Sequence, residues 1–435
     1  MITPNFTVRQ DHEFVYVSIK VTHLKAQNVE LRADGDIFMF SLPPYYLRLH
    51  FPGNIVDDDR ANANFDLASS TLHVKFPKEM PGEEFADLDM LSKLLARVGD
   101  TKTGSETTPE QSSQKKGLIQ EIDAHGPLLQ QELIEAEEFD WQIEQQLPSE
   151  NEDGLQTARY GFNSQYGGFL KQTGEIGNDI NELANPEAST IESRHAERIQ
   201  RENEKFDADY YLSDKFENPD INDLIEFTLP IVSLVQNFLQ TENADFGKVE
   251  FTEHERDQMM RLPRRSYLID SAVQVKSIYL GLIPLIFAYG YEVRTTLNDH
   301  TSESAWTVGK IAANVACLDA SFTSVRETQV ACIRRALAYP LYRNFELAVK
   351  IWQDTYYILR GGKRTILKAL LDVNQLLSFH DVYYVYAKIV TEDYCAWIQT
   401  ANDVVIRGLA HEVHNLQISK SDIGWDLDQL EASVE

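Results

Sequence analysis

Hydrophobic and polar residues alternate along roughly the first 80 residues of the chain. In 15–21 every second residue is aliphatic, and the same alternation returns in 46–51 and 72–76. A period of two is typical of strands that bury one face. The run 37–42 is apolar at nearly every position and predicts a strand covered on both faces. Short strands separated by Gly, Pro, Asn and Asp predict an antiparallel β-sandwich, and the apolar spacing of 88–97 predicts a short helix after it.

From about residue 189 onward the apolar period changes to 3.6. Large apolar side chains recur at helical spacing over 345–359, 366–377 and 383–397, and no convincing strand pattern interrupts them. This half of the chain is therefore predicted to be a large helical domain. The longest uncharged apolar stretch, 277–291, is too short to cross a bilayer and predicts a buried core helix, so we expect no membrane association.

The stretch between these two regions differs in composition. Residues 99–134 are predicted to form a flexible linker, because their first part, 99–117, contains no aliphatic or aromatic residue. In 135–188 large aromatic residues return among glycines and acids. This arm is either a disordered acidic stretch or a loop-rich segment packed on the helical domain, and the cost of exposing Trp and Phe favours the second. The predicted organisation is a domain at 1–98, the linker, and a domain at 135–435 that includes the arm.

Composition narrows the classes of function. The 435 residues carry 40 basic and 68 acidic side chains, a net charge of −28, so we expect no direct binding of nucleic acid. The three cysteines cannot form a disulfide framework and are expected to be reduced and buried. The first residues lack a basic segment followed by an apolar one, so no secretory signal is expected and the protein is predicted to be intracellular.

One segment reverses the acidic balance. Between residues 326 and 368 there are nine basic and three acidic residues, and within this island 334–344 reads RRALAYPLYRN. Arginine and tyrosine contribute much of the binding energy at protein interfaces. We therefore predict a partner-binding site at Arg334, Arg335, Tyr339, Tyr342 and Arg343. The alternative, which stays open, is an internal ion-pair cluster that holds the break in the helix made by the proline at position 340.

A second cationic group in the island contains Arg360, Lys363 and Arg364 around two glycines. These three residues are the next candidates for partner binding. The glycines could present backbone N–H groups to an anion at the start of the following helix. Alternatively they end the preceding helix, with the cations near its last turn, and this is favoured because nothing else of a nucleotide site accompanies them.

No catalytic constellation is recognisable, and we expect no cofactor, no metal and no small-molecule substrate. His411 and His414 are three residues apart, whereas a helical zinc pair needs a spacing of four. His380 and Asp381 are adjacent and point in different directions on a helix, so we expect a core and capping role, with Asp381 near a helix start. The protein is therefore predicted not to be an enzyme.

Several motifs taken together resemble the SHQ family, and the resemblance covers nearly the whole chain. The first region contains PPYYLRLHFP at 43–52 and DLDMLSKLLARVGD at 87–100. The helical region contains SAWTVGK at 304–310, RRALAYPLYRN at 334–344, ILRGGKR at 358–364 and FHDVYYVY at 379–386. The arm contains FDWQIEQ at 139–145, YGF at 160–162 and NDINEL at 178–183. Each motif alone is weak, but their combination is specific.

The resemblance implies a multidomain fold in which an N-terminal all-β CS-type antiparallel sandwich precedes an all-α helical SHQ-specific domain. Members of the family are assembly chaperones of box H/ACA ribonucleoproteins. They bind the pseudouridine synthase subunit, dyskerin in animals, before guide RNA is loaded, and they shield its RNA-binding surface. The resemblance also implies a nuclear location, with the cytoplasm as a second compartment.

Three hypotheses about function follow. In the first, the helical domain clamps the basic synthase, and its acidic surface takes the place of RNA. In the second, the protein is a general co-chaperone that recruits a heat-shock ATPase through the sandwich, although a fold alone does not establish such a function. In the third, which ranks last, the loop at 361–364 binds an anionic substrate of an enzyme.

Overall fold

The computed structural model describes residues 2–434 except 22–28, 43, 67–68, 96–157, 172–176, 241–248, 266, 268 and 270. The chain forms two compact units. The first contains residues 1–110 and 250–267, and the second contains 111–249 and 268–435. The predicted linker at 99–134 and the first part of the arm lie outside the described residues.

The first unit is an antiparallel sandwich of two sheets. One sheet has the strand order β1-β2-β7-β6 and the other β3-β4-β5. The strands are β1 Phe6–Gln10, β2 Phe14–Lys20, β3 Glu30–Asp34, β4 Ile37–Leu42, β5 Tyr45–His50, β6 Asn62–Asp66 and β7 Thr71–Pro77. The predicted sandwich is therefore confirmed.

The register of the strands explains where the core of the sandwich lies. In β2 and β7, Val17 lies opposite Val74 and Ile19 lies opposite Leu72, and all four side chains are buried. Phe38 of the other sheet packs edge-on against Phe76, with ring centroids 5.6 Å apart. Burial of such alternating residues is the main stabilising contribution of a sandwich.

The expectation that 37–42 is covered on both faces is wrong. In β4, Phe38, Phe40 and Leu42 are buried, whereas Ile37 and Met39 on the other face are half-buried. The three-stranded sheet buries one face against the other sheet. An apolar residue on the outer face of a sheet imitates the pattern of a strand covered on both sides.

The helix after the sandwich is paired with a segment from far along the chain. Helix α1, Leu91–Leu95, confirms the core of the predicted helix. It contacts α7, Glu253–Arg261, which begins at a capping box formed by Thr252 and Glu255. Ser92 Oγ donates a 2.6 Å hydrogen bond to the carbonyl oxygen of Met259. Residues 250–267 thus group with the first unit, whereas the predicted domain at 135–435 includes this segment.

The second unit is helical, as predicted. Its helices are α3 Ile191–Lys205, α4 Ala208–Phe216, α5 Asp220–Glu226, α6 Pro230–Leu239, α8 Ala272–Thr295, α9 Ser304–Ile311, α10 Ala313–Ala316, α11 Val325–Ala338, α12 Phe345–Arg360, α13 Gly362–Ser378, α14 Tyr384–Tyr386, α15 Glu392–Trp397, α16 Asp403–Asn415 and α17 Leu427–Ala432. A π-helix at Ala387–Thr391 joins α14 to α15. The three predicted helical stripes fall on α12, on α13 and on the α14–α15 run.

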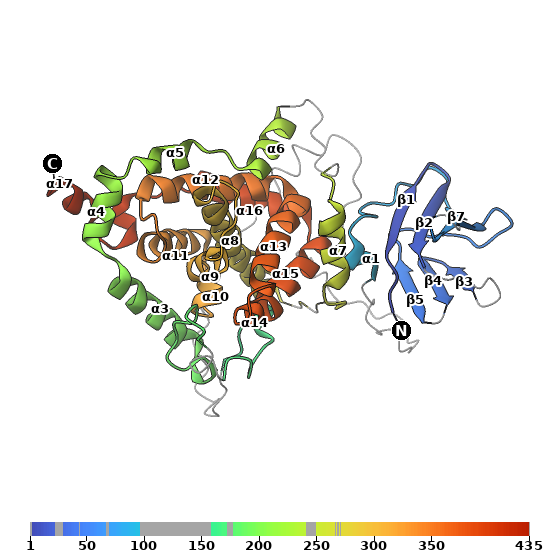
Figure 1. Ribbon diagram of the computed structural model, residues 1–435, viewed down its shortest axis with the longest axis horizontal. Coiled ribbons are helices and arrows are strands. Elements are labelled where there is room, and N and C mark those ends of the chain that lie inside the picture. Colours follow the sequence, from blue (N-terminus) through green and yellow to red (C-terminus); the bar gives the residue numbers. More distant parts are fainter. Residues whose placement is uncertain are drawn as a thin grey trace, which may run out of the picture. The chain divides into compact units, whose positions relative to one another are not determined.

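Helix α8 forms the centre of the second unit (Figure 1). It contacts α9, α11, α12 and α13, and every residue from Ile278 to Arg294 is buried. By length and composition this helix could cross a membrane. Its burial among other helices identifies it as the core helix that the sequence predicted.

The described part of the arm, 158–171 and 177–188, packs on the helices. Tyr160, Phe162 and Tyr166 are buried, and Tyr166 donates a hydrogen bond from its hydroxyl to Asp393. Gly161 has a φ of +75°, and a Cβ there would lie 2.3 Å from the carbonyl oxygen of Ile389. Only glycine allows this close approach to the π-helix.

Candidate functional site

The first half of the motif at 334–344 lies in a network of buried charges. Helix α11 carries Arg334 and Arg335 in adjacent positions, and the shortest contacts of the two side chains are with different carboxylates. Arg335 Nη2 lies 2.9 Å from Glu182 Oε1, and Arg334 Nε lies 2.6 Å from Glu202 Oε2. Since adjacent helical residues diverge in direction, one turn of α11 joins the arm to helix α3.

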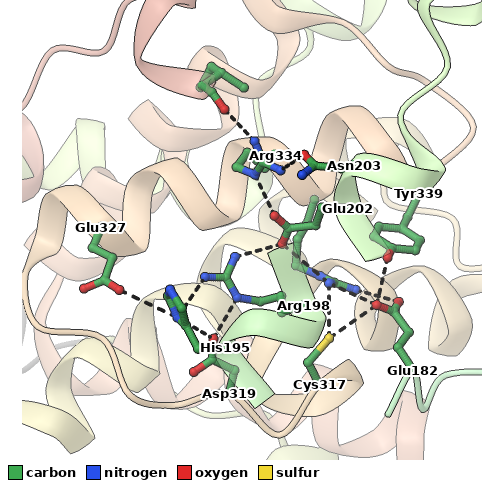
Figure 2. A network of polar contacts seen from close by, with 12 residues as sticks. Glu182, His195, Arg198, Glu202, Asn203, Cys317, Asp319, Glu327, Arg334 and Tyr339 are labelled. Atoms are coloured by element: carbon green, nitrogen blue, oxygen red, sulfur yellow. Dashed lines mark hydrogen bonds and ion pairs between the residues drawn. The ribbon is translucent and has the colours of Figure 1, made fainter. Parts of the chain in front are cut away.

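The network extends along α3. Arg198 donates to Glu202 at 2.9 Å and to Asp319 at 2.7 Å. His195 lies 3.3 Å from the same Asp319 carboxylate, which raises the pKa of the histidine. Figure 2 shows these residues in one continuous chain of contacts. Paired charges of this kind satisfy one another, but removal of one partner leaves an uncompensated buried ion.

The electrostatics of Glu182 follow from its neighbours. Burial alone would raise the pKa of this carboxyl, but the Arg335 guanidinium, helped by Lys310, lowers it to about 2. Tyr339 completes the site by donating its hydroxyl to Glu182 Oε2 at 2.8 Å. Arg335 also lies over the Tyr339 ring, 4.4 Å from its centroid. The carboxylate is held ionised inside a closed cluster.

Arg334, Arg335 and Tyr339 are therefore not surface residues. Arg335 is fully buried, and Arg334 and Tyr339 are 7% and 8% exposed. Their side chains have no free face to offer a partner in this structure. Of the two interpretations of the motif, the internal ion-pair cluster describes these three residues. Helix α11 ends at Ala338, two residues before Pro340, so the expected helix break is also present.

The second half of the motif reaches the surface as a loop at 340–344, which we call the Leu341 loop. The buried Tyr291 hydroxyl donates to the carbonyl oxygen of Tyr342 at 2.8 Å and accepts its N–H at 3.1 Å. The N–H of Arg343 donates to Asp214 at 2.6 Å. Leu341 itself is 68% exposed. Tyr342 and Arg343 are half-buried beside it and stay candidates for partner binding.

The glycine pair lies between helices α12 and α13. Gly362 has a φ of +77°, the left-handed conformation that ends a helix, so the capping interpretation is confirmed. The N–H of Lys363, at the start of α13, donates to Asp403 at 3.1 Å. This helix start therefore binds a carboxylate of the chain itself. Arg364 is buried and donates to the carbonyl oxygen of Val249, while Lys363 and Arg360 are half-buried.

The remaining candidate groups have structural contacts. His414 stacks on Tyr356, with ring centroids 4.4 Å apart, and His411 contacts Asn415. Within the described ranges no group of three His, Cys, Asp or Glu residues could hold a metal ion. Cys317, Cys332 and Cys395 are buried free thiols, as expected. His380 Nδ1 accepts the N–H groups of Val382 and Tyr383, so the histidine, rather than Asp381, caps this turn.

Sequence reasoning missed the carboxylates that partner the arginines. Glu182 and Arg335 are 153 positions apart, and Arg198 and Asp319 are 121 positions apart. No local spacing encodes such pairs. The available signal was indirect: arginines within an apolar helix of a strongly acidic chain are expected to find buried carboxylates.

Comparisons with known proteins agree with this architecture. A family model described as the SHQ1-like CS domain matches residues 3–95, and one described as the SHQ1 protein, Shq1 domain, matches 240–427. Protein shq1 of Schizosaccharomyces pombe is 42% identical over 100% of this chain and 97% of the relative. Protein SHQ1 homologs of Xenopus tropicalis and Mus musculus are 36% and 34% identical over 100% of this chain and 70% and 75% of their own lengths. These matches confirm the resemblance and the predicted fold class.

Proposed function

This chain belongs to the SHQ1 family, and from that premise we propose that it is a non-enzymatic assembly chaperone for box H/ACA ribonucleoproteins. It binds the pseudouridine synthase subunit, dyskerin in animals, before RNA is loaded and shields its RNA-binding surface. The observation that carries the proposal is the likeness over the full chain to relatives named for SHQ1, which includes both the sandwich and the helical region.

The charge of the chain supports a basic protein as partner. A protein surface that holds guide RNA must be basic, because it neutralises phosphates. A chain with a net charge of −28 is attracted to such a surface and is repelled by the RNA that competes for it. Complementary charge of this kind increases the rate of encounter and weakens as salt is added.

The placement of the perturbed charges supports binding rather than catalysis. Catalytic acids and bases need shifted pKa values in a site that substrate can enter. Here the carboxyls with strongly lowered pKa values, Glu182 and Asp319, have side chains that are 6% and 0% exposed, and arginines, a lysine and a histidine neutralise them. The network stabilises the packing of α3, α11 and the arm, and it leaves these groups no access to a substrate.

A rigid helical body suits a holding chaperone. Helix α8 is buried along most of its length, and the network fixes the arm to the helices around it. A surface that is formed before its partner arrives loses little conformational entropy on binding. The Leu341 loop fits this description, because Tyr291 and Asp214 hold its backbone while Leu341 stays exposed.

A binding experiment tests the proposal. The full chain and the purified pseudouridine synthase of the same organism are combined at low salt, with and without guide RNA, and complex formation is measured by co-purification and titration. We expect a stable complex that weakens with added salt and that guide RNA displaces. The proposal would be contradicted if the synthase bound guide RNA and this chain at the same time and independently. It would also be contradicted if this chain and the synthase formed no complex.

The same binding experiment distinguishes the proposed function from the alternative, a general co-chaperone. A general co-chaperone would bind a heat-shock ATPase through the sandwich and would show no preference for the synthase. We also propose that the protein resides in the nucleus, which imaging of a tagged chain in cells measures directly.

A further inference from the structure

Three motifs that are distant in the sequence meet at one hollow on the second unit. Its lining combines acidic, hydroxyl and aromatic side chains from the arm, from the start of α9 and from the turn before α14. The residues are Asp179, Ser302, Glu303, Trp306, His380 and Tyr383. They belong to NDINEL, to SAWTVGK with the two residues before it, and to FHDVYYVY. We call this site the aromatic–acidic hollow.

The aromatic side of the hollow is held firmly in place. The His380 and Tyr383 rings stack with centroids 3.7 Å apart and an angle of 8° between their planes. His380 Nδ1 accepts two backbone N–H groups, which fixes the orientation of the imidazole. The hydroxyl of Tyr383 donates to the Asp179 carboxylate. These contacts arrange the ring faces before any ligand arrives, so that binding requires little reorganisation.

The polar side of the hollow is negatively charged. Asp179 and Glu303 are exposed, and the described residues that line the hollow include no lysine or arginine. Such a lining repels phosphate and attracts a cation. A guanidinium suits it better than an ammonium, because a planar cation can stack on an aromatic ring while donating paired hydrogen bonds to carboxylates.

Two large aromatic residues are direct sequence neighbours of His380 and Tyr383, which line the hollow. Phe379 is 73% exposed and Tyr384 is 46% exposed. The ring of Tyr384 already has a cation of the chain against it, since Lys388 Nζ lies 5.2 Å from its centroid. Exposed aromatic residues next to a charged recess are typical of an interaction surface.

We propose that the aromatic–acidic hollow receives an arginine side chain of a basic protein partner, with Phe379 and Tyr384 packing on the apolar surface around that arginine. Asp179 and Glu303 accept hydrogen bonds from the guanidinium, and Trp306 and the His380–Tyr383 stack provide ring faces. This inference rests on the proposed function for the identity of the partner, and it adds the surface and the side chain that are recognised.

Two matched variants of the full chain test the hollow. The hollow variant carries Glu303→Lys with Phe379→Ser. The control variant carries Glu226→Lys with Val273→Ser, which makes the same change in charge and removes another exposed apolar residue, 47% exposed, elsewhere on the second unit. All four positions are exposed, so both variants should retain the thermal unfolding profile of the unaltered chain.

The probe for the first measurement is the purified pseudouridine synthase. We expect its dissociation constant to rise at least tenfold with the hollow variant and less than threefold with the control. Equal affinities for the two variants would overturn the inference while leaving the proposed function intact.

A second probe tests the hollow even if the synthase does not bind. Fluorescent peptides of nine arginines, nine lysines and nine glutamates are titrated into each chain and followed by anisotropy. We expect the arginine peptide to bind more tightly than the lysine peptide, and this preference to be lost in the hollow variant alone. Equal behaviour of the two variants would contradict the inference, as would a preference for the acidic peptide. If the unaltered chain self-associates, and only the hollow variant loses this self-association, the occupant of the hollow is a second copy of the chain and the inference is wrong.

Discussion

The buried network around Arg335 and the aromatic–acidic hollow contain the same kinds of residue in opposite situations. In the network, Arg335, Lys310 and Tyr339 surround Glu182, and these partners come from the chain itself. In the hollow, Asp179 and Glu303 lie beside aromatic rings, and no arginine is among the described residues of the lining. In the network each carboxylate is paired with cations of the chain, whereas the described lining of the hollow supplies carboxylates without an arginine or lysine. The comparison indicates that residue types common at interfaces do not locate an interface until the partners of each charge are known.

The largest expected effect tests whether the network supports the fold. Arg335→Met leaves Glu182 without its closest cation and Glu202 with one fewer, so the free energy of unfolding should fall by about 3–5 kcal/mol. Urea unfolding followed by tryptophan fluorescence measures this, because the described tryptophans all lie in the second unit. Arg343→Met in the Leu341 loop is the control, with an expected loss below about 1 kcal/mol. Equal losses would remove the distinction between the buried Arg335 and the half-buried Arg343.

The second largest expected effect is the loss of stability of the network in acid. The pKa of Glu182 is lowered from its ordinary 4.5 to about 2 in the folded chain, so its contribution is present above pH 4.5 and is lost as the pH falls towards 2. The loss is about 3 kcal/mol by proton linkage. In Glu182→Gln the unfolding free energy should be lower at neutral pH and should fall less steeply between pH 4.5 and 2. Parallel curves for the two chains would show that the network does not hold this carboxyl ionised.

A pair of matched hydroxyl deletions compares the two regions directly. Tyr339 and Tyr383 each donate a hydroxyl to a carboxylate, but the Glu182 side chain is only 6% exposed, whereas Asp179 is an exposed residue. Tyr339→Phe should cost about 1–3 kcal/mol, because a buried charge loses a donor, and Tyr383→Phe should cost less than about 1 kcal/mol. Unfolding titrations of both variants measure the difference. The reverse order would mean that the hollow supports the fold more than the network does.

The smallest expected effect concerns the rim of the hollow. Phe379→Ser removes a side chain that is 73% exposed, so the free energy of unfolding should change by less than about 0.5 kcal/mol. Thermal unfolding of the single variant measures this. A loss above about 2 kcal/mol would make Phe379 part of the core and would remove the argument that it is available for binding.

The sequence predicted the regular elements well, because each depends on neighbours along the chain. Alternation in 15–21 corresponds to β2, and the 3.6-residue stripe in 345–359 corresponds to α12. Asn344 caps α12 through its side chain, in agreement with where the stripe begins. The exception, 37–42, shows that local pattern cannot tell an apolar outer face from a second buried one.

The candidate site was predicted less well, because it depends on residues far apart in the chain. Arg334, Arg335 and Tyr339 point inward, because their carboxylate partners come from the arm and from α3. Tyr342 and Arg343 stay near the surface. The hollow was missed because each of its three segments contributes only one to three side chains, and only folding places Asp179 beside Tyr383.

The assignment of α7 to the first unit has a consequence for how the protein is made. Met259, whose carbonyl accepts the bond from Ser92, is synthesised roughly 160 residues after α1. At the usual rate of translation this is a delay on the order of ten seconds. During that interval the emerging sandwich lacks its last helix, so its completion must wait until the arm and helices α3 to α6 have been synthesised.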